Sequence, residues 1–269
     1  MKKVISILLV LVLSLGLLTA CSSGSADDKT ITVGASVTPH AEILRAVEAD
    51  LAAQGYTLKV VEYNDYVLPN TATESGELDA NYFQHQPYLT DFNANNDTHL
   101  VSVASIHYEP FGVYAGKVDS LDALVEGSTI AIPNDGTNEA RALYLLEAEG
   151  LIAQKDGIGF TATVLDIAEN PLNLKIEELE AAQLVRALED VDVAVINGNY
   201  AIQGGLKVAD ALAVEDASSD SAQTYANILV VKEGNEDLEK VQVLADALQS
   251  ETVRAFMEET YAGAVVPIF

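Results

Sequence analysis

The 269-residue sequence is poor in cysteine, tryptophan and basic residues. It contains one cysteine, no tryptophan, and 14 lysine and arginine residues against 41 aspartate and glutamate residues. A single cysteine excludes an intramolecular disulfide and a metal centre built from several thiolates. The formal net charge of −27 repels the phosphates of nucleic acids, so we expect no nucleic-acid partner.

The sequence also lacks the short motifs of common enzyme classes. It has no Gly-x-Ser-x-Gly nucleophile elbow and no phosphate-binding Gly-x-x-x-x-Gly-Lys segment. Its acidic residues are so many that no single pair of carboxylates is informative. We therefore expect a protein that is not an enzyme and that carries no cofactor.

The amino terminus carries the longest apolar run of the chain. Lys2 and Lys3 precede the apolar residues 4–18, and Cys21 follows two small residues. An apolar run of this length behind two lysines predicts a signal peptide over residues 1–20 rather than a membrane span.

The string Leu18-Thr19-Ala20-Cys21 resembles the lipobox of bacterial lipoproteins, whose cysteine is diacylated and becomes the new amino terminus. We expect acylation of Cys21, with palmitate as a typical acyl group, and a flexible tether over residues 21–30. Two acyl chains would hold the protein at the extracytoplasmic side of the cell membrane. Cleavage before Cys21 would leave 12 basic and 41 acidic residues, a net charge of −29. An ordinary signal peptide with a chance cysteine is the alternative.

Strands and helices alternate along the remaining chain, whose roughly 240 residues can bury a large core. The pattern predicts strands over residues 31–36, 56–63, 80–84, 100–108, 129–132, 163–165, 175–177, 191–196 and 225–231. It predicts helices over residues 39–54, 64–76, 87–96, 120–125, 138–149, 181–188, 237–249 and 251–260. This alternation is typical of an α/β protein with mainly parallel sheets flanked by helices.

The length of the chain favours two lobes. The alternation restarts after residues 107–114, which indicates a crossing from one lobe to the other, and the apolar strand over residues 225–231 indicates the return. We expect residues 31–110 and 226–269 to form the first lobe and residues 111–225 to form the second.

The segment 79–89 is the first candidate for a ligand site. Its alternation predicts a strand in which Asn81, Phe83 and His85 face one side, while Tyr82 and Gln84 face the other. The bland alternative is that the aromatic residues belong to the core and that His85 is a hydrogen-bonded turn residue.

A helix that begins near Pro87 would place Tyr88 beside His85, at the carboxyl end of the predicted strand. Ligands of open α/β sheets bind at this end of the strands. The sequence therefore favours a partly aromatic, partly polar binding site here.

Arg141 is the second candidate. It lies in the first turn of a predicted helix, after the loop 134–138, whose free backbone N–H groups would favour an anion. A guanidinium at this position could bind a carboxylate through two parallel hydrogen bonds. The alternative is a surface arginine paired with Glu139 or Glu147.

Asn197 and Asn227 are polar residues in strongly apolar surroundings. Asn197 follows the apolar residues 191–196, and Asn227 interrupts the apolar run 225–231. Such an asparagine needs partners for both its carbonyl and its amide, and the carbonyl could accept a hydrogen bond from a ligand ammonium. A turn or cap role is the ordinary explanation for Asn197.

The histidines support a rival hypothesis, a metal-ion-binding lipoprotein. His40, His85 and His107 each lie near a predicted strand end, and neutral imidazoles bind transition metals. Together with Glu109 they could form a site of three nitrogens and one carboxylate. No paired spacing such as His-x-x-x-His supports this site.

Several separate strings, in one order along the chain, resemble the NlpA-type methionine-binding lipoproteins of ABC importers. They are Tyr63-Asn64-Asp65-Tyr66-Val67-Leu68-Pro69-Asn70; Asp79-Ala80-Asn81 with Phe83-Gln84-His85 and Pro87-Tyr88-Leu89; Pro133-Asn134-Asp135 with Thr137-Asn138 and Arg141; Thr163-Val164-Leu165-Asp166 with Glu169-Asn170-Pro171; and Ala194-Val195-Ile196-Asn197. The resemblance covers nearly the whole chain after residue 30.

The resemblance implies a two-lobed periplasmic-binding-protein fold of type II with two hinge crossings. It implies a monomer that binds methionine, or a close derivative, between its lobes and delivers it to a membrane permease and its ATPase. By the same resemblance, the side-chain pocket corresponds to Tyr66, Phe83, His85 and Tyr88. The polar contacts to the amino-acid backbone correspond to Asn138, Arg141, Asn197 and Asn227.

Overall fold

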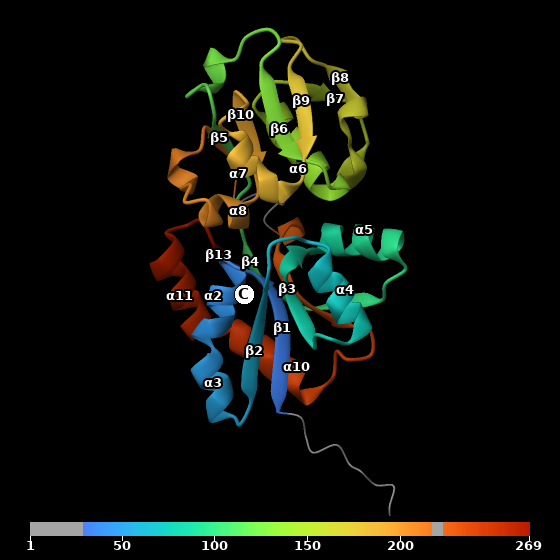
Figure 1. Ribbon diagram of the computed structural model, residues 1–269, viewed down its shortest axis with the longest axis vertical. Coiled ribbons are helices and arrows are strands. Elements are labelled where there is room, and N and C mark those ends of the chain that lie inside the picture. Colours follow the sequence, from blue (N-terminus) through green and yellow to red (C-terminus); the bar gives the residue numbers. More distant parts are fainter. Residues whose placement is uncertain (1–28, 217–222) are drawn as a thin grey trace, which may run out of the picture.

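The computed structural model describes residues 29–216 and 223–269. The predicted signal peptide, the predicted acylation site Cys21 and nearly all of the predicted tether lie outside these residues. No helix of the described part is long and apolar enough to span a membrane. The described residues form two lobes, each organised around one sheet (Figure 1).

The larger sheet has six strands in the order β13-β4-β12-β3-β1-β2. Strand β1 runs parallel to β2 and β3, whereas β12 runs antiparallel between β3 and β4. The strands are β1 (Thr30–Ser36), β2 (Thr57–Tyr63), β3 (Ala80–His85), β4 (Leu100–Tyr108), β12 (Asn227–Lys232) and β13 (Val266–Pro267). The helices of this lobe are α2 (His40–Ala46), α3 (Glu48–Ala53), α4 (Leu68–Ser75), α5 (Gln86–Asn96), α10 (Glu239–Leu248) and α11 (Glu251–Tyr261).

The smaller sheet has five strands in the order β11-β5-β10-β6-β9. Strands β9, β6 and β10 are parallel, and β5 runs antiparallel to β10. The strands are β5 (Gly112–Ala115), β6 (Thr129–Pro133), β9 (Lys175–Leu179), β10 (Val193–Ile196) and β11 (Ala213–Val214), with β7 (Ala153–Gln154) and β8 (Ile167–Glu169) as a separate pair. The helices are α6 (Gly136–Ala148), α7 (Leu184–Ala187) and α8 (Gly198–Gln203), with the 3₁₀ turns η1 (Leu121–Ala123), η2 (Gly159–Thr161), η3 (Val164–Asp166), η4 (Ala181–Gln183) and η5 (Val208–Asp210).

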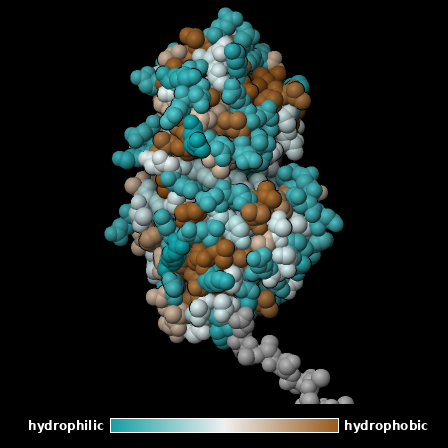
Figure 2. Space-filling view, in the orientation of Figure 1, coloured by the Kyte–Doolittle hydropathy of each residue, from teal (hydrophilic) through white to brown (hydrophobic). Residues whose placement is uncertain are grey.

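Each lobe has its own apolar core. Ile31, Leu44 and Leu229 are fully buried between the helices and the six-stranded sheet, and Ile130 and Leu143 are fully buried in the other lobe. The chain passes between the two sheets once after β4 and returns between β11 and β12. The face shown in Figure 2 is mostly hydrophilic, with apolar side chains in separate patches.

The predicted α/β architecture is confirmed, but three predicted elements are wrong. The predicted helix over residues 120–125 is only the short 3₁₀ turn η1. Residues 163–165 do not form a strand, because Asp166 accepts hydrogen bonds from the backbone N–H and the hydroxyl of Thr163 and so closes the 3₁₀ turn η3. The predicted helix over residues 39–54 is two helices, α2 and α3, because Val47 departs from helical geometry with φ −101° and ψ 4°.

The predicted faces of strand β3 are also wrong. Gln84 lies opposite Ile228 and Tyr82 lies opposite Leu229, so the register shifts and Phe83 is an extra residue on β3. Such a β-bulge reverses the alternation beyond it. Gln84 therefore lies on the same side as Asn81, to which its amide donates a hydrogen bond at 2.8 Å.

We expect the cost of removing a leucine side chain to follow its burial in this fold. Leu143→Ala should lower the free energy of unfolding by about 2–5 kcal/mol, because Leu143 is fully buried in the core of the smaller lobe. Leu165→Ala is the matched control, because Leu165 is 81% exposed, and it should change the free energy by less than about 0.5 kcal/mol. Urea unfolding followed by circular dichroism measures both, and equal losses would contradict the assigned core.

Candidate functional site

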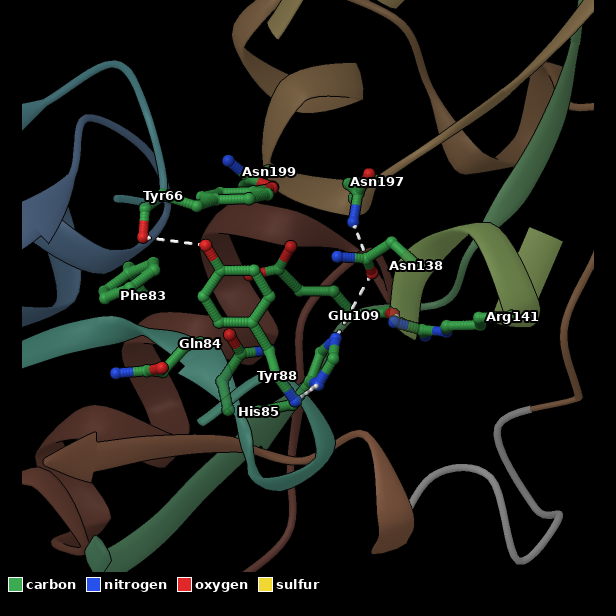
Figure 3. Close-up of a pocket in the computed structure, with 12 residues that line it drawn as sticks. Tyr66, Phe83, Gln84, His85, Tyr88, Glu109, Asn138, Arg141, Asn197 and Asn199 are labelled. Carbon is green, nitrogen blue, oxygen red and sulfur yellow. Dashed lines mark hydrogen bonds between the residues drawn. The ribbon is translucent and has the colours of Figure 1, made fainter. Parts of the chain in front are cut away.

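A cavity lies between the two lobes, where the carboxyl ends of several strands meet. The space between its lining side chains, together with its opening to solvent, is about 350 Å³. All eight residues that the sequence suggested as ligand contacts line it. Figure 3 labels all of them except Asn227. Four further residues complete the lining: Gln84, Glu109, Gly198 and Asn199.

The wall on the larger lobe is aromatic. The ring centroids of Tyr66 and Phe83 are 5.8 Å apart in a stacked arrangement, and those of Tyr66 and Tyr88 are 5.8 Å apart in an edge-to-face arrangement. The hydroxyl of Tyr88 donates to the backbone carbonyl of Tyr66 at 3.0 Å, which fixes the ring of Tyr88. Such a wall suits an apolar side chain, and a thioether sulfur in particular.

His85 lies beside the aromatic residues and links the two lobes. Its Nδ1 accepts a hydrogen bond from the backbone N–H of Tyr88 and so caps helix α5, which leaves the proton on Nε2. Nε2 donates to Oδ1 of Asn138 in the other lobe at 3.2 Å. Burial, with a smaller contribution from Arg141, lowers the pKa of His85 to about 3, so the imidazole is neutral at pH 7.

Arg141 is buried on helix α6, and its main partner is Glu215. Its Nε donates to Oε1 of Glu215 at 2.8 Å, and its Nη2 donates to Oε2 of Glu215 and to the backbone carbonyl of Glu109. The guanidinium carbon lies 4.3 Å from the ring centroid of Tyr225. Arg141 therefore lies in the cavity wall with Phe83 and Tyr88, not in open solvent.

Glu215 is a residue that the sequence did not reveal. Its carboxylate also accepts hydrogen bonds from the hydroxyl of Tyr108 at 2.6 Å and from the backbone N–H of Phe111 at 3.1 Å. Although burial acts to raise the pKa of Glu215, these donors and Arg141 hold it below its usual value. The predicted alternative partners of Arg141, Glu139 and Glu147, are wrong. No local sequence signal joins residues 74 positions apart.

The pair with Glu215 also changes how Arg141 meets an anion. The hydrogen bonds to Glu215 and Glu109 use Nε and Nη2, and none of them uses Nη1. A ligand carboxylate in the cavity would therefore contact the Nη1 edge rather than the side that Glu215 already occupies.

The asparagines of the cavity divide into bonded and free groups. Oδ1 of Asn138 accepts from His85 and also from Nδ2 of Asn197 at 3.0 Å, and Oδ1 of Asn227 lies 2.9 Å from Nε2 of His40. In the described part of the chain, two buried amide atoms of the lining have no hydrogen-bond partner, Oδ1 of Asn197 and Nδ2 of Asn199. One free acceptor and one free donor therefore remain for a ligand.

Asn199 was not predicted as a site residue, although it follows Asn197 by only two positions. Helix α8 begins directly after Asn197 and turns both side chains toward the cavity. The hydroxyl of Tyr66 donates to Oδ1 of Asn199 at 2.6 Å, which is a second hydrogen bond between the lobes.

Three of the four residues proposed as metal ligands, His40, His107 and Glu109, lie together, and Glu109 is also part of the cavity lining. Nε2 of His107 is 2.7 Å and Nε2 of His40 is 3.5 Å from Oε1 of Glu109. His85 does not belong to this cluster, because its ring bonds Asn138 and Tyr88 instead, so the four-residue site is wrong. Hydrogen bonding explains the cluster, because Nδ1 of His107 also pairs with the hydroxyl of Tyr82.

The fold and this cavity define a two-lobed binding protein of type II. The chain belongs to the NlpA lipoprotein family, whose family model matches residues 31–269. It is 43% identical over 255 residues to the D-methionine-binding lipoprotein MetQ of Escherichia coli K12, covering 93% of this chain and 92% of that protein.

Solved structures agree with this assignment. A lipoprotein structure from Ruminococcus gnavus is 55% identical, with a TM-score of 0.89 over 90% of this chain and 100% of that chain. A nutrient-binding protein from Burkholderia cenocepacia, solved with bound methionine, is 44% identical, with a TM-score of 0.85 over 89% of this chain and 100% of that chain.

We expect Glu215→Ala to destabilise the protein by about 3–5 kcal/mol, because it leaves the buried Arg141 guanidinium without its carboxylate. Glu251→Ala is the control, since it removes a carboxylate that is 88% exposed and pairs with Arg254, and its effect should be small. Guanidinium chloride unfolding measures both free energies. Similar values for the two variants would show that the buried pair contributes no more than a surface pair.

Proposed function

We propose that the protein is a membrane-anchored substrate-binding lipoprotein that binds methionine, or a close derivative, and delivers it to the permease of an ABC importer. The observation that carries this proposal is the single cavity in which an aromatic wall from one lobe faces Arg141 and free amide groups from the other. The names of the relatives, among them a methionine-bound structure, support the same ligand.

The eight predicted residues would have different roles around such a ligand. Tyr66, Phe83 and Tyr88 would surround the thioether, with His85 at their edge. The Nη1 edge of Arg141 would bind the carboxylate. Asn197 would bind the ammonium, and Asn138 would hold His85 and Asn197 in place. Oδ1 of Asn227 is already bonded to His40, so Asn227 would offer its Nδ2 group to the ligand.

The polar contacts must provide much of the affinity. Burial of a methionine side chain contributes about 1.5–3 kcal/mol, and sulfur–aromatic contacts contribute about 0.3–1.5 kcal/mol more. A micromolar dissociation constant corresponds to about 8 kcal/mol after the cost of ordering is subtracted. The aromatic wall alone therefore does not suffice.

The remaining parts of the proposal follow from the family role. A receptor of this kind has no reaction of its own, works as a monomer beside a permease and an ATPase, and is held at the membrane through acylated Cys21. Residues 31–110 and 226–269 would form one lobe and residues 111–225 the other, and closure of the lobes would enclose the ligand.

Native mass spectrometry of freshly purified protein tests the ligand directly. We expect a mass increment equal to one methionine, which disappears after unfolding and dialysis and returns when methionine is added to the refolded protein. Treatment with a chelator should leave the increment unchanged. A chelator-sensitive increment equal to a metal ion would instead support the metal hypothesis.

Arg141→Lys should weaken methionine binding by more than about tenfold. Lysine keeps a positive charge beside Glu215. Its ammonium lacks the planar fork of a guanidinium, so it cannot donate to Glu215, to the Glu109 carbonyl and to a ligand at the same time. Isothermal titration calorimetry gives the dissociation constants. Arg45→Lys is the matched control, because Arg45 is exposed and pairs only with Glu62 at 2.6 Å in the described residues. Unchanged binding by Arg141→Lys would contradict the role of Arg141 in recognising the carboxylate.

A further inference from the structure

Glu109 is a buried carboxylate in the wall of the cavity. It follows strand β4 in the crossing between the lobes, and Figure 3 shows it among the other lining residues. Its side chain is 7% exposed. Its Oε1 accepts a hydrogen bond from Nε2 of His107 at 2.7 Å, and its carboxylate also accepts from the backbone N–H of Asn199. Glu109 therefore touches both lobes and faces the space between them.

The two imidazoles near Glu109 are neutral donors. Nε2 of His40 lies 2.9 Å from the carbonyl oxygen of Asn227, so this nitrogen carries the proton. Nδ1 of His107 pairs with the hydroxyl of Tyr82, so its Nε2 carries the proton toward Glu109. Burial lowers the pKa of His40 to about 4 and that of His107 to about 3, so neither ring is charged at pH 7.

Arg141 makes no hydrogen bond to the carboxylate of Glu109, although its positive charge partly offsets the effect of burial on the pKa of that carboxyl. Its Nη2 reaches only the backbone carbonyl of Glu109, and its own charge is matched by the bidentate pair with Glu215. Among residues 29–216 and 223–269, the ion pairs of Glu109 are only those with His40 and His107. The charged side chains of the lining are therefore Arg141, whose charge is already matched by Glu215 behind it, and Glu109, which has no cationic partner of its own.

Buried charges in proteins occur with a partner of opposite sign, because an isolated buried charge is costly. The missing positive charge beside Glu109 is the charge that the ammonium group of an amino acid would bring. Burial raises the pKa of Glu109, which is the direction expected when its counter-ion arrives only with the ligand. The free Oδ1 of Asn197 lines the same cavity and can accept a second N–H of that ammonium.

We propose that Glu109 binds the ammonium group of the ligand, together with Oδ1 of Asn197, while the carboxylate meets Arg141. This inference rests on the proposed function and adds a determinant of the substrate class. The site selects a zwitterion with a free primary ammonium beside its carboxylate, and it discriminates against the same molecule without the nitrogen.

The test compares methionine with 4-(methylthio)butanoate, which keeps the thioether and the carboxylate and lacks the ammonium. Glu109→Gln preserves the shape of the side chain and an oxygen for His107, and removes the charge. We expect Glu109→Gln to weaken methionine binding by about 10- to 100-fold, because a hydrogen bond to a charged group contributes about this factor to an affinity. Binding of the analogue, which has no ammonium, should change by less than about threefold. Equal losses for both ligands would overturn the proposal.

Glu139→Gln is the matched control, because Glu139 is also a buried glutamate but its carboxylate bonds the backbone N–H of Val164 and does not line the cavity. It should leave both dissociation constants unchanged. Wild-type protein gives an independent check if Glu109→Gln does not fold. It should bind the analogue at least about tenfold more weakly than methionine, and equal affinities would overturn the proposal.

The same titrations separate this inference from the proposed function. Loss of methionine binding in Arg141→Lys with unchanged binding in Glu109→Gln would sink the role of Glu109 and leave the methionine receptor intact. Absence of methionine binding by the wild-type protein would sink the proposed function itself.

Discussion

The ion pair between Arg141 and Glu215 joins three segments that are far apart in the chain. Arg141 comes from helix α6 and Glu215 follows strand β11. The carboxylate also accepts hydrogen bonds from Tyr108, the last residue of β4, and from Phe111 in the crossing after it. Burying such a pair is costly, and four donors to one carboxylate offset that cost. Because the same crossing carries Glu109, this pair fixes the relative positions of the charged groups in the cavity.

Several single hydrogen bonds join the lobes around the cavity. Tyr66 bonds Asn199, His85 bonds Asn138, and the hydroxyl of Tyr200 donates to the backbone carbonyl of Asn64 at 3.1 Å. Water can replace such hydrogen bonds when the lobes separate, so each contributes little net free energy. Contacts of this kind define one closed arrangement without making it permanent, which is the requirement for a receptor that takes up and releases its ligand.

Local patterns in the sequence predicted most strands and helices, because side-chain alternation and helix signals act over a few residues. They failed where a distant segment decides the geometry. The bulge at Phe83 depends on pairing with strand β12. The side of the sheet on which Gln84 lies could therefore not be predicted from residues 79–89 alone. The eight predicted site residues lie on one cavity, whereas Glu215 was missed because only the folded chain brings it to Arg141. Asn199 was missed because a polar residue in a short helix has no distinctive pattern.

Gly198 sets the distance of closest approach between the two halves of the molecule. A methyl group on its α-carbon would lie 2.7 Å from Cβ and 2.8 Å from Oε2 of Glu109, both shorter than carbon and oxygen atoms tolerate. Cβ of Glu109 is fixed to the backbone and cannot rotate away, so the crossing between β4 and β5 would have to move. The missing side chain at this position therefore lets the two lobes approach each other. A single extra carbon atom would push them apart and favour an open arrangement of the receptor.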